Sequence, residues 1–161
     1  MKRILALLLG LGTALTLCAC TGSTTTSATV DMAELQTAML EAGTFPTMRS
    51  VTGDDDMAAQ NFTYFSKLDY DKVENYLLSF SNTGTPDEFA VIALKDPDDV
   101  QEDAVSLNEH KDSRCNIFRQ YSPEQLRMAE TGIVFTKDQY AVLIISENPQ
   151  AIREAFEQQL G

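Results

Sequence analysis

The side chains best suited to nucleophilic chemistry in this chain are its single histidine, His110, and the nearby thiol of Cys115. A histidine that takes the proton of a cysteine is a common nucleophilic pair. The surrounding residues predict one long helix, on which a separation of five positions places two side chains about 140° apart. The two groups therefore cannot meet, and we expect a solvated His110 and a half-buried Cys115 that acts as a small apolar residue.

Two groups of acidic residues could supply oxygen ligands to calcium or magnesium. They are Asp54–Asp56 in an expected loop, and Asp96, Asp98 and Asp99 before an expected helix. Neither group follows the spacing of an EF-hand. The favoured interpretation is a solvated charge run for the first group and helix capping for the second, with cation binding as the alternative. We predict no metal and no cofactor.

The adjacent carboxylates Asp87 and Glu88 are a pair that could act in glycoside hydrolysis. They lie at an expected strand, where neighbouring side chains point to opposite faces of the sheet, which argues against joint action. The chain has no G-x-S-x-G elbow, no H-E-x-x-H motif and no glycine-rich phosphate loop after a strand. We therefore predict that the protein is not an enzyme and has no catalytic residue. The alternative is a carboxylate-based or divalent-cation-assisted cell-surface hydrolase.

Aromatic residues gather in one third of the expected domain, where Tyr64, Tyr70 and Tyr76 lie close in sequence to Phe62 and Phe65. Such a group could form a ligand surface, and the three tyrosines are the candidate residues for one. The chain has no tryptophan, which makes a carbohydrate-binding platform less attractive. Ordinary core packing is the favoured alternative for this group.

The start of the chain has the pattern of a bacterial lipoprotein signal. A basic start is followed by an apolar run from Ile4 to Leu17, too short for an ordinary membrane-spanning helix, and then by a small residue, Ala19, directly before Cys20. We expect residues 1–19 to be a signal peptide that is removed, and Cys20 to carry diacylglycerol and palmitate. The predicted location is the extracytoplasmic face of the cell membrane, with a lipid anchor.

The balance of charge is strongly acidic and limits the partners that this protein could have. The chain has a net charge of −12, and loss of Lys2 and Arg3 with the signal peptide would make it about −14. Nucleic-acid binding needs the opposite sign, and an anionic membrane would repel this surface. Membrane attachment must therefore come from the lipid on Cys20. A protein or small ligand at the cell surface is the remaining kind of partner.

The expected domain organisation is simple. Residues 20–30 are the lipidated cysteine and a flexible Ser/Thr linker, and residues 31–161 are a single globular domain. Cys115 has no partner for an intramolecular disulfide, so the domain must be stabilised by its hydrophobic core. A helix is expected from Asp31 to Gly43, and a loop over residues 44–56. Residues 61–65 read as a short strand or an aromatic packing segment.

The rest of the chain twice shows a hairpin, an Asx-Pro pair and a helix. The hairpins are residues 74–80 with 89–94, and 133–135 with 141–145. The helices follow Asp96-Pro97 and Asn148-Pro149, and another short helix is expected from about Pro123 to Gly132. The repeat indicates an internal duplication or two uses of a common capping device. We predict an α+β fold, in which an antiparallel sheet of about four strands is packed by helices mainly on one face.

Several short runs occur in an order that resembles a known family. They are AMLEAG, LDYDKVENY, DEFAVIALKD, Arg114, QYSPEQ and QYAVLIIS, and together they extend over about residues 31–160. The chain resembles Gram-positive lipoproteins that carry a domain of unknown function of the 4358 series. The resemblance implies a cell-surface location and no catalytic residues. One departure is Asp138, where the family hairpin tends to carry glycine, but aspartate tolerates the left-handed backbone that such a turn needs.

Overall fold

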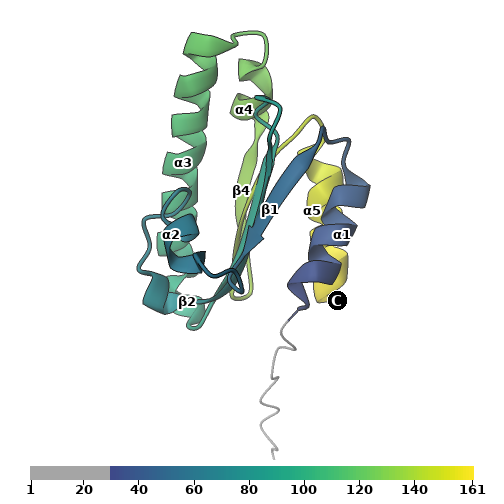
Figure 1. Cartoon of the computed structure of the whole chain (residues 1–161). Helices are drawn as coiled ribbons and strands as arrows, with labels where there is room; N and C mark the ends of the chain where they lie inside the picture. Colours follow the sequence, from purple (N-terminus) through teal and green to yellow (C-terminus); the bar gives the residue numbers. More distant parts are fainter. Residues whose placement is uncertain (1–29) are drawn as a thin grey trace, which may run out of the picture.

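The computed structural model describes residues 30–161 (Figure 1). The expected signal peptide and Cys20 lie outside the described residues. None of the helices in the described part of the chain is long and apolar enough to cross a membrane. In chain order the elements are α1 (Met32–Ala42), β1 (Met48–Thr52), α2 (Ala58–Phe62), the 3-10 turn η1 (Tyr70–Lys72), β2 (Val73–Ser81), β3 (Glu88–Leu94), the 3-10 turn η2 (Pro97–Asp99), α3 (Val100–Tyr121), α4 (Leu126–Thr131), β4 (Ile133–Lys137), β5 (Tyr140–Ile145) and α5 (Pro149–Leu160).

The five strands form one antiparallel sheet in the order β1-β2-β3-β5-β4, which confirms the predicted α+β class. Both expected hairpins are present, and Asp138 has a positive φ of 51° at the β4–β5 turn. The strand beyond the expected four is β1, which lies within the predicted loop over residues 44–56. Its residues show no alternation of buried and exposed positions because it is an edge strand. Residues 61–65 are not a strand but the end of helix α2 and the turn after it. They are the alternative that was expected, an aromatic packing segment, because Phe62 and Phe65 are buried with their rings 5.2 Å apart.

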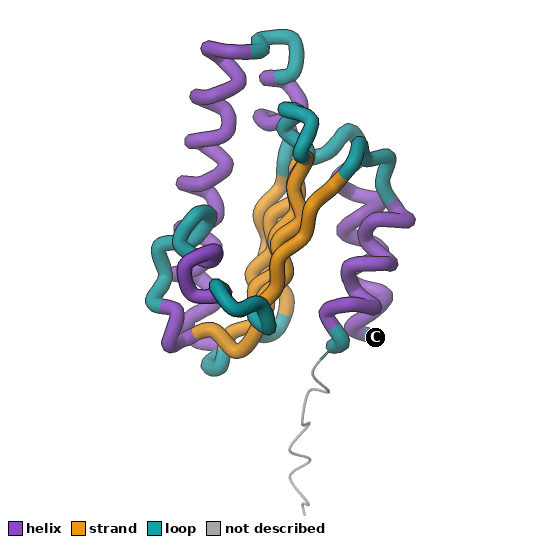
Figure 2. The backbone as a smooth tube through the Cα atoms, in the orientation of Figure 1, coloured by secondary structure: helices purple, strands orange, loops and turns teal. Residues whose placement is uncertain are grey.

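Helices cover both faces of the sheet, rather than mainly one as expected (Figures 1 and 2). The reason lies in β3 and β5, because every residue of both strands is buried. Strands with apolar residues on both sides need cover on both sides. Helices α1 and α5 pack on one side, here called the α1/α5 face, and α2, α3 and α4 pack on the other, here called the α3 face.

The α1/α5 face has a largely apolar core, in which Ser79 Oγ is buried and accepts a hydrogen bond from Ser50 Oγ at 2.9 Å. Phe156 of α5 is fully buried, and its ring lies 5.6 Å from that of Phe135 and 5.9 Å from that of Tyr140. Asp31 caps helix α1, because its side chain accepts hydrogen bonds from the backbone amides of residues 33 and 34. The buried members of this core are Met32, Leu35, Met39, Leu77, Phe89, Val91, Ala93, Tyr140, Val142, Ile144, Ile152 and Phe156.

The α3 face is covered less evenly. Helix α3 packs mainly on β5 and β4, and the short helix α2 contacts β1. The alternating residues Tyr76, Leu78 and Phe80 of β2 point to this face. Because α3 does not extend over β1 and β2, part of their surface stays open.

The two hairpin-helix units are not related by symmetry. β3 and β5 are antiparallel neighbours, so a two-fold axis that exchanged them would run perpendicular to the sheet. Such an axis leaves each face of the sheet in place, so the helices that follow β3 and β5 would lie on the same face. In the structure α3 and α5 lie on opposite faces. Asp96 accepts a hydrogen bond from the amide of Asp98, and Asn148 accepts one from that of Ala151. This arrangement favours two uses of one capping device over a symmetric duplication.

Candidate functional site

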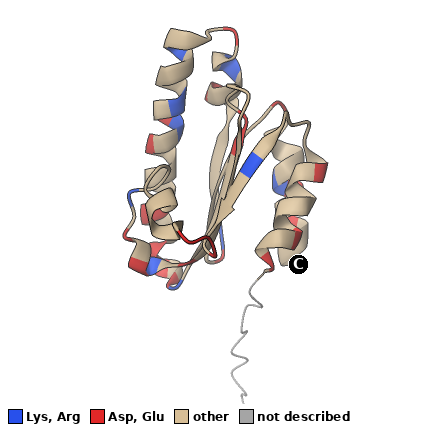
Figure 3. Ribbon diagram, viewed as in Figure 1, with Lys and Arg blue, Asp and Glu red and all other residues tan. Residues whose placement is uncertain are grey.

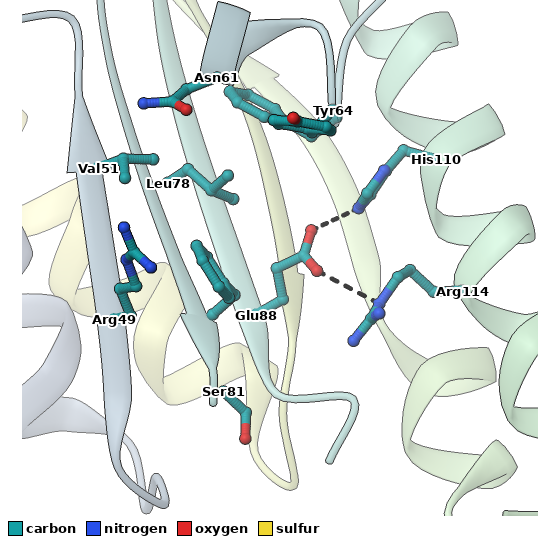
Figure 4. A pocket seen from close by; sticks show the side chains of 11 residues that line it. Arg49, Val51, Asn61, Tyr64, Leu78, Ser81, Glu88, His110 and Arg114 are labelled. Atoms are coloured by element: carbon teal, nitrogen blue, oxygen red, sulfur yellow. Dashed lines mark hydrogen bonds and ion pairs between the residues drawn. The ribbon is translucent and has the colours of Figure 1, made fainter. Parts of the chain in front are cut away.

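A pocket of about 470 Å³ lies on the α3 face, above the part of β1 and β2 that helix α3 leaves open (Figure 4). Strands β1, β2 and β3 form its floor, α3 forms one wall, and the segment at α2 forms another. We call it the Glu88 pocket. Its lining residues are Arg49, Val51, Asn61, Tyr64, Phe65, Leu78, Phe80, Ser81, Glu88, His110 and Arg114.

The strand register sets the floor of the Glu88 pocket. Arg49 of β1 lies opposite Phe80 of β2, which in turn lies opposite Glu88 of β3. In the next row on the same face, Val51 lies opposite Leu78. Neighbouring strands are about 4.8 Å apart, so the backbones at Arg49 and Glu88 are separated by about 10 Å. The floor is therefore an apolar strip with one basic and one acidic residue at its ends.

Glu88 is held by two residues of helix α3. His110 Nε2 donates to Glu88 Oε1 at 2.5 Å, and Arg114 Nε lies 3.3 Å from Oε2 as an ion pair without the geometry of a hydrogen bond. His110 and Arg114 are four positions apart, which places both on one side of a helix. Glu88 is only 4% exposed, and a buried carboxylate needs such partners to balance the loss of water.

Arg114 is itself fixed in place. Its guanidinium lies 5.1 Å from the centre of the Phe118 ring, and its Nη2 donates to the carbonyl of Thr85 at 3.5 Å. These contacts leave little freedom to the side chain, which stays beside the carboxylate of Glu88. The pocket therefore contains a pre-organised cation on the α3 side.

Arg49 differs from Arg114 in having no such partners. No hydrogen bond or ion pair joins its side chain to another residue of 30–161, and the residue is exposed at the mouth of the pocket. In Figure 4 its guanidinium lies on the side of the pocket opposite Arg114. Tyr64 is also at the mouth and is 69% exposed.

The pocket is locally basic on an acidic protein. With His110 counted as neutral, two arginines and one carboxylate give the lining a net charge of +1, although the chain carries −12. Acidic residues are spread over the helices and loops of the domain (Figure 3). A basic site within an acidic surface attracts anions locally while the surrounding field repels them at long range.

The structure separates His110 from Cys115, as the helical spacing predicts. Cys115 is 8% exposed, burial raises the pKa of its thiol, and it makes no contact with His110 that a nucleophilic pair would need. The expectation of a solvated His110 is wrong, because its side chain is only 17% exposed and contacts Glu88. Sequence reasoning missed this contact, since it joins residues of two separate elements.

The three candidate tyrosines do not form one ligand surface. Tyr64 lines the Glu88 pocket, whereas Tyr70 and Tyr76 do not. Tyr76 is fully buried, its hydroxyl donates to the carbonyl of Ala58 at 2.9 Å, and burial raises the pKa of that hydroxyl to about 12. Tyr70 packs against the rings of Phe62 and Tyr76. Core packing is therefore the role of Tyr70 and Tyr76.

The acidic residues considered for catalysis or metal binding are separated. Asp87 accepts a hydrogen bond from Thr85 Oγ1, while Glu88 contacts α3, so the two adjacent carboxylates do not act as a pair. Among residues 30–161 no group of three or more metal-ligating side chains is close enough to hold an ion. Asp55 accepts a hydrogen bond from the amide of Thr52, and Asp96 caps η2.

A second polar cluster lies beside the pocket. Asp103 of α3 is fully buried, and Ser66 Oγ donates to its Oδ1 at 2.6 Å, but its Oδ2 has no partner. Burial raises the pKa of the Asp103 carboxyl to about 6. Ser106 Oγ accepts from the amide of Lys67 at 2.6 Å and lies one turn before His110. This cluster ties α3 to the segment that carries Tyr64.

A family model described as Domain of unknown function (DUF4358) matches residues 50–146. That region contains all the residues that line the Glu88 pocket except Arg49, and it leaves out helices α1 and α5. No curated protein and no solved structure matches the chain significantly.

Proposed function

This chain belongs to the family described as Domain of unknown function (DUF4358), and from that premise we propose that it is a non-enzymatic binding protein anchored at the outer face of the cell membrane. Its domain binds a small ligand in the Glu88 pocket, and the lipid on Cys20 holds it at the membrane. The observation that carries the proposal is a preformed pocket with an apolar floor and a few fixed polar groups.

Two features of the pocket support binding over the hydrolase alternative. Glu88 is the one carboxylate among the described residues that line it, whereas hydrolysis by paired carboxylates needs two. The serine in the lining, Ser81, shares a hydrogen bond with Thr83 and has no contact with His110. The groups present can hold and orient a ligand, but they do not form a nucleophile with its base.

Ligand binding is tested by thermal unfolding of the full chain in lipid nanodiscs, with amino acids, short peptides, wall sugars, calcium and magnesium as additions. A ligand present at a hundred times its dissociation constant adds about 2.7 kcal/mol to the stability, so it raises the unfolding temperature measurably. Val51→Phe adds a ring on the pocket floor and should abolish the shift. Ile117→Phe is the control, because it adds a ring to an exposed position on α3 outside the pocket. A shift that survives Val51→Phe, or no shift with any class, would contradict the proposal.

The anchor is tested separately. Cys20→Ala should release the protein from the membrane fraction or leave it uncleaved, because the diacylglycerol has no thiol to join. Cys18→Ala is the matched control, since Leu17 before Cys18 is too large for the cleavage site. Metabolic labelling with palmitate gives the readout. Labelling that persists in Cys20→Ala would show that the assignment is wrong.

A further inference from the structure

We infer that the Glu88 pocket recognises a ligand with a single carboxylate on a small apolar body. This inference rests on the proposed function, because it names the class of ligand that the same pocket would take. Three observations support it. Arg49 has no partner at one end of the pocket floor, Glu88 is paired with Arg114 at the other end, and apolar side chains lie between them.

The first observation is the position of Arg49. Its guanidinium lines the pocket and has no acidic partner among residues 30–161, whereas Arg114 is already beside Glu88. A guanidinium offers a planar pair of donors that matches a carboxylate in two-point hydrogen bonding. Arg49 is therefore the group free to bind an anion that enters the pocket.

The second observation is the charge of the lining. Glu88 carries one negative charge, Arg114 offsets it, and Arg49 leaves a surplus of one positive charge. A ligand with one negative charge would neutralise this surplus. A dianionic phosphate would add a second negative charge near Glu88, which costs energy at short range in a partly buried site. The count therefore favours a carboxylate over a phosphate.

The third observation is the apolar strip between the two arginines. Val51, Leu78, Phe65 and Phe80 line the pocket, and Arg49 and Glu88 lie on either side of Phe80 in the sheet. The volume of about 470 Å³ lies within the range of about 300–1,000 Å³ that is usual for small-molecule pockets. A body the size of one aromatic or aliphatic amino acid would cover this strip and remove it from water.

Such a carboxylate could come from a free small molecule or from the end of a peptide. Strand β1 is an edge strand, so a peptide could also pair with its open side. The experiment distinguishes these sources by using N-acetyl-L-phenylalanine and the peptide acetyl-Ala-Ala-Ala-Phe with a free carboxyl end. N-acetylphenylalaninamide is the neutral control for N-acetyl-L-phenylalanine. Phenyl phosphate is the fourth probe and tests whether the pocket prefers a dianion.

Dissociation constants for the four probes are measured by calorimetry on the full chain in lipid nanodiscs. We expect the carboxylates to bind at least about tenfold more tightly than the amide, since hydrogen bonds to a charged group are the strong ones. Arg49→Gln should remove that preference while leaving the affinity for the amide unchanged. Arg127→Gln removes the same charge from an exposed position outside the pocket and should change nothing.

The single histidine gives an independent readout. With isotope-labelled histidine, the spectrum contains one imidazole, that of His110, whose contact with Glu88 lies in the pocket. The signal should move when a carboxylate probe is added. It should be the same in ligand-free Arg49→Gln as in the unchanged protein, which would show that the variant is folded around Glu88.

The outcomes separate this inference from the proposed function. Equal binding of the acid and the amide, tighter binding of phenyl phosphate, or no effect of Arg49→Gln would overturn the inference while pocket binding still stood. If no probe binds and the His110 signal stays fixed, the inference also fails. The broader screen with Val51→Phe then decides the proposed function by itself. Preference for the free acid or for the peptide end supports the inference and identifies the source.

Discussion

The two faces of the sheet differ in how helices cover them and in the side chains that they bury. On the α1/α5 face, two helices cover a largely apolar set of side chains, among them Phe89 and Phe156. On the α3 face, helix α3 covers one half of the sheet, and it brings buried Asp103 and the partners of buried Glu88 into that layer. Apolar burial on the α1/α5 face can therefore stabilise the fold, while the α3 face carries charged groups and an open pocket.

The largest effect on stability is expected on the α1/α5 face. Phe156→Ala removes a fully buried ring that contacts Phe135 and Tyr140, and it should lower the free energy of unfolding by about 4 kcal/mol. Urea denaturation of residues 30–161, which contain both core clusters, measures this loss. A cost below about 1 kcal/mol would show that this face is not the main source of stability. Ligand binding in the Glu88 pocket should not change in any folded Phe156 variant.

Glu88→Gln tests whether the charged group of the α3 face is also a structural element. It removes the charge that balances Arg114 and weakens the contact with His110, so it should cost about 3 kcal/mol, as when a buried pair loses one partner. It should also strengthen binding of a carboxylate probe, because the net charge of the pocket rises. Denaturation and calorimetry on the same sample measure both. Loss of stability without tighter binding would contradict an anion site next to Glu88.

Asp103 should make the α3 face sensitive to pH. The pKa of its carboxyl is raised in the folded state from 3.8 to about 6, so the folded protein holds the proton more tightly than the unfolded chain does. Its contribution to stability is therefore greatest below about pH 4 and falls as the pH rises through 6, by about 2 to 3 kcal/mol. Asp103→Asn should remove this dependence and be the more stable protein at pH 8. The control is Asp112→Asn, an exposed position on the same helix, whose unfolding should follow the unchanged protein from pH 4 to 8.

The smallest effect on stability is expected at the mouth of the pocket. Tyr64 is 69% exposed, so Tyr64→Ala should change the free energy of unfolding by less than about 0.5 kcal/mol. The same substitution should weaken ligand binding several-fold, because the ring forms part of the lining. Paired denaturation and binding measurements check this. Equal binding by Tyr64→Ala would place the ligand away from the mouth.

The parts of the fold that were predicted correctly depend on local patterns. The run from Phe89 to Leu94 is apolar on both sides and is a strand buried on both sides, and the Asx-Pro pairs lie where helical turns begin. Strand β1 was missed for a physical reason. Its sequence has no apolar alternation, and its hydrogen bonds to β2 alone make it a strand.

The site was less predictable because it is formed by long-range contacts. The helical spacing correctly separated His110 from Cys115, but it could not show that α3 lies close enough to β3 for His110 to contact Glu88. Arg49 lay in an expected loop, so its place beside Phe80 followed only from the register of β1 with β2. The sequence signal that could have indicated the contact was the spacing of His110 and Arg114, four positions apart on a predicted helix. That helix follows a predicted strand next to Glu88, whose carboxylate could pair with them.

The strand order also has a consequence for how the chain folds. β2 with β3 and β4 with β5 are local hairpins, which form in about 1–10 μs, but the pairing of β3 with β5 encloses α3, α4 and β4. Closing the loop from β3 to β5 costs more conformational entropy than closing either hairpin. The joining of the two hairpins should therefore limit the folding rate. Val142→Ala, at the β3–β5 pairing, should therefore slow refolding in stopped-flow measurements. A change in the unfolding rate alone would show that the hairpins join after the transition state.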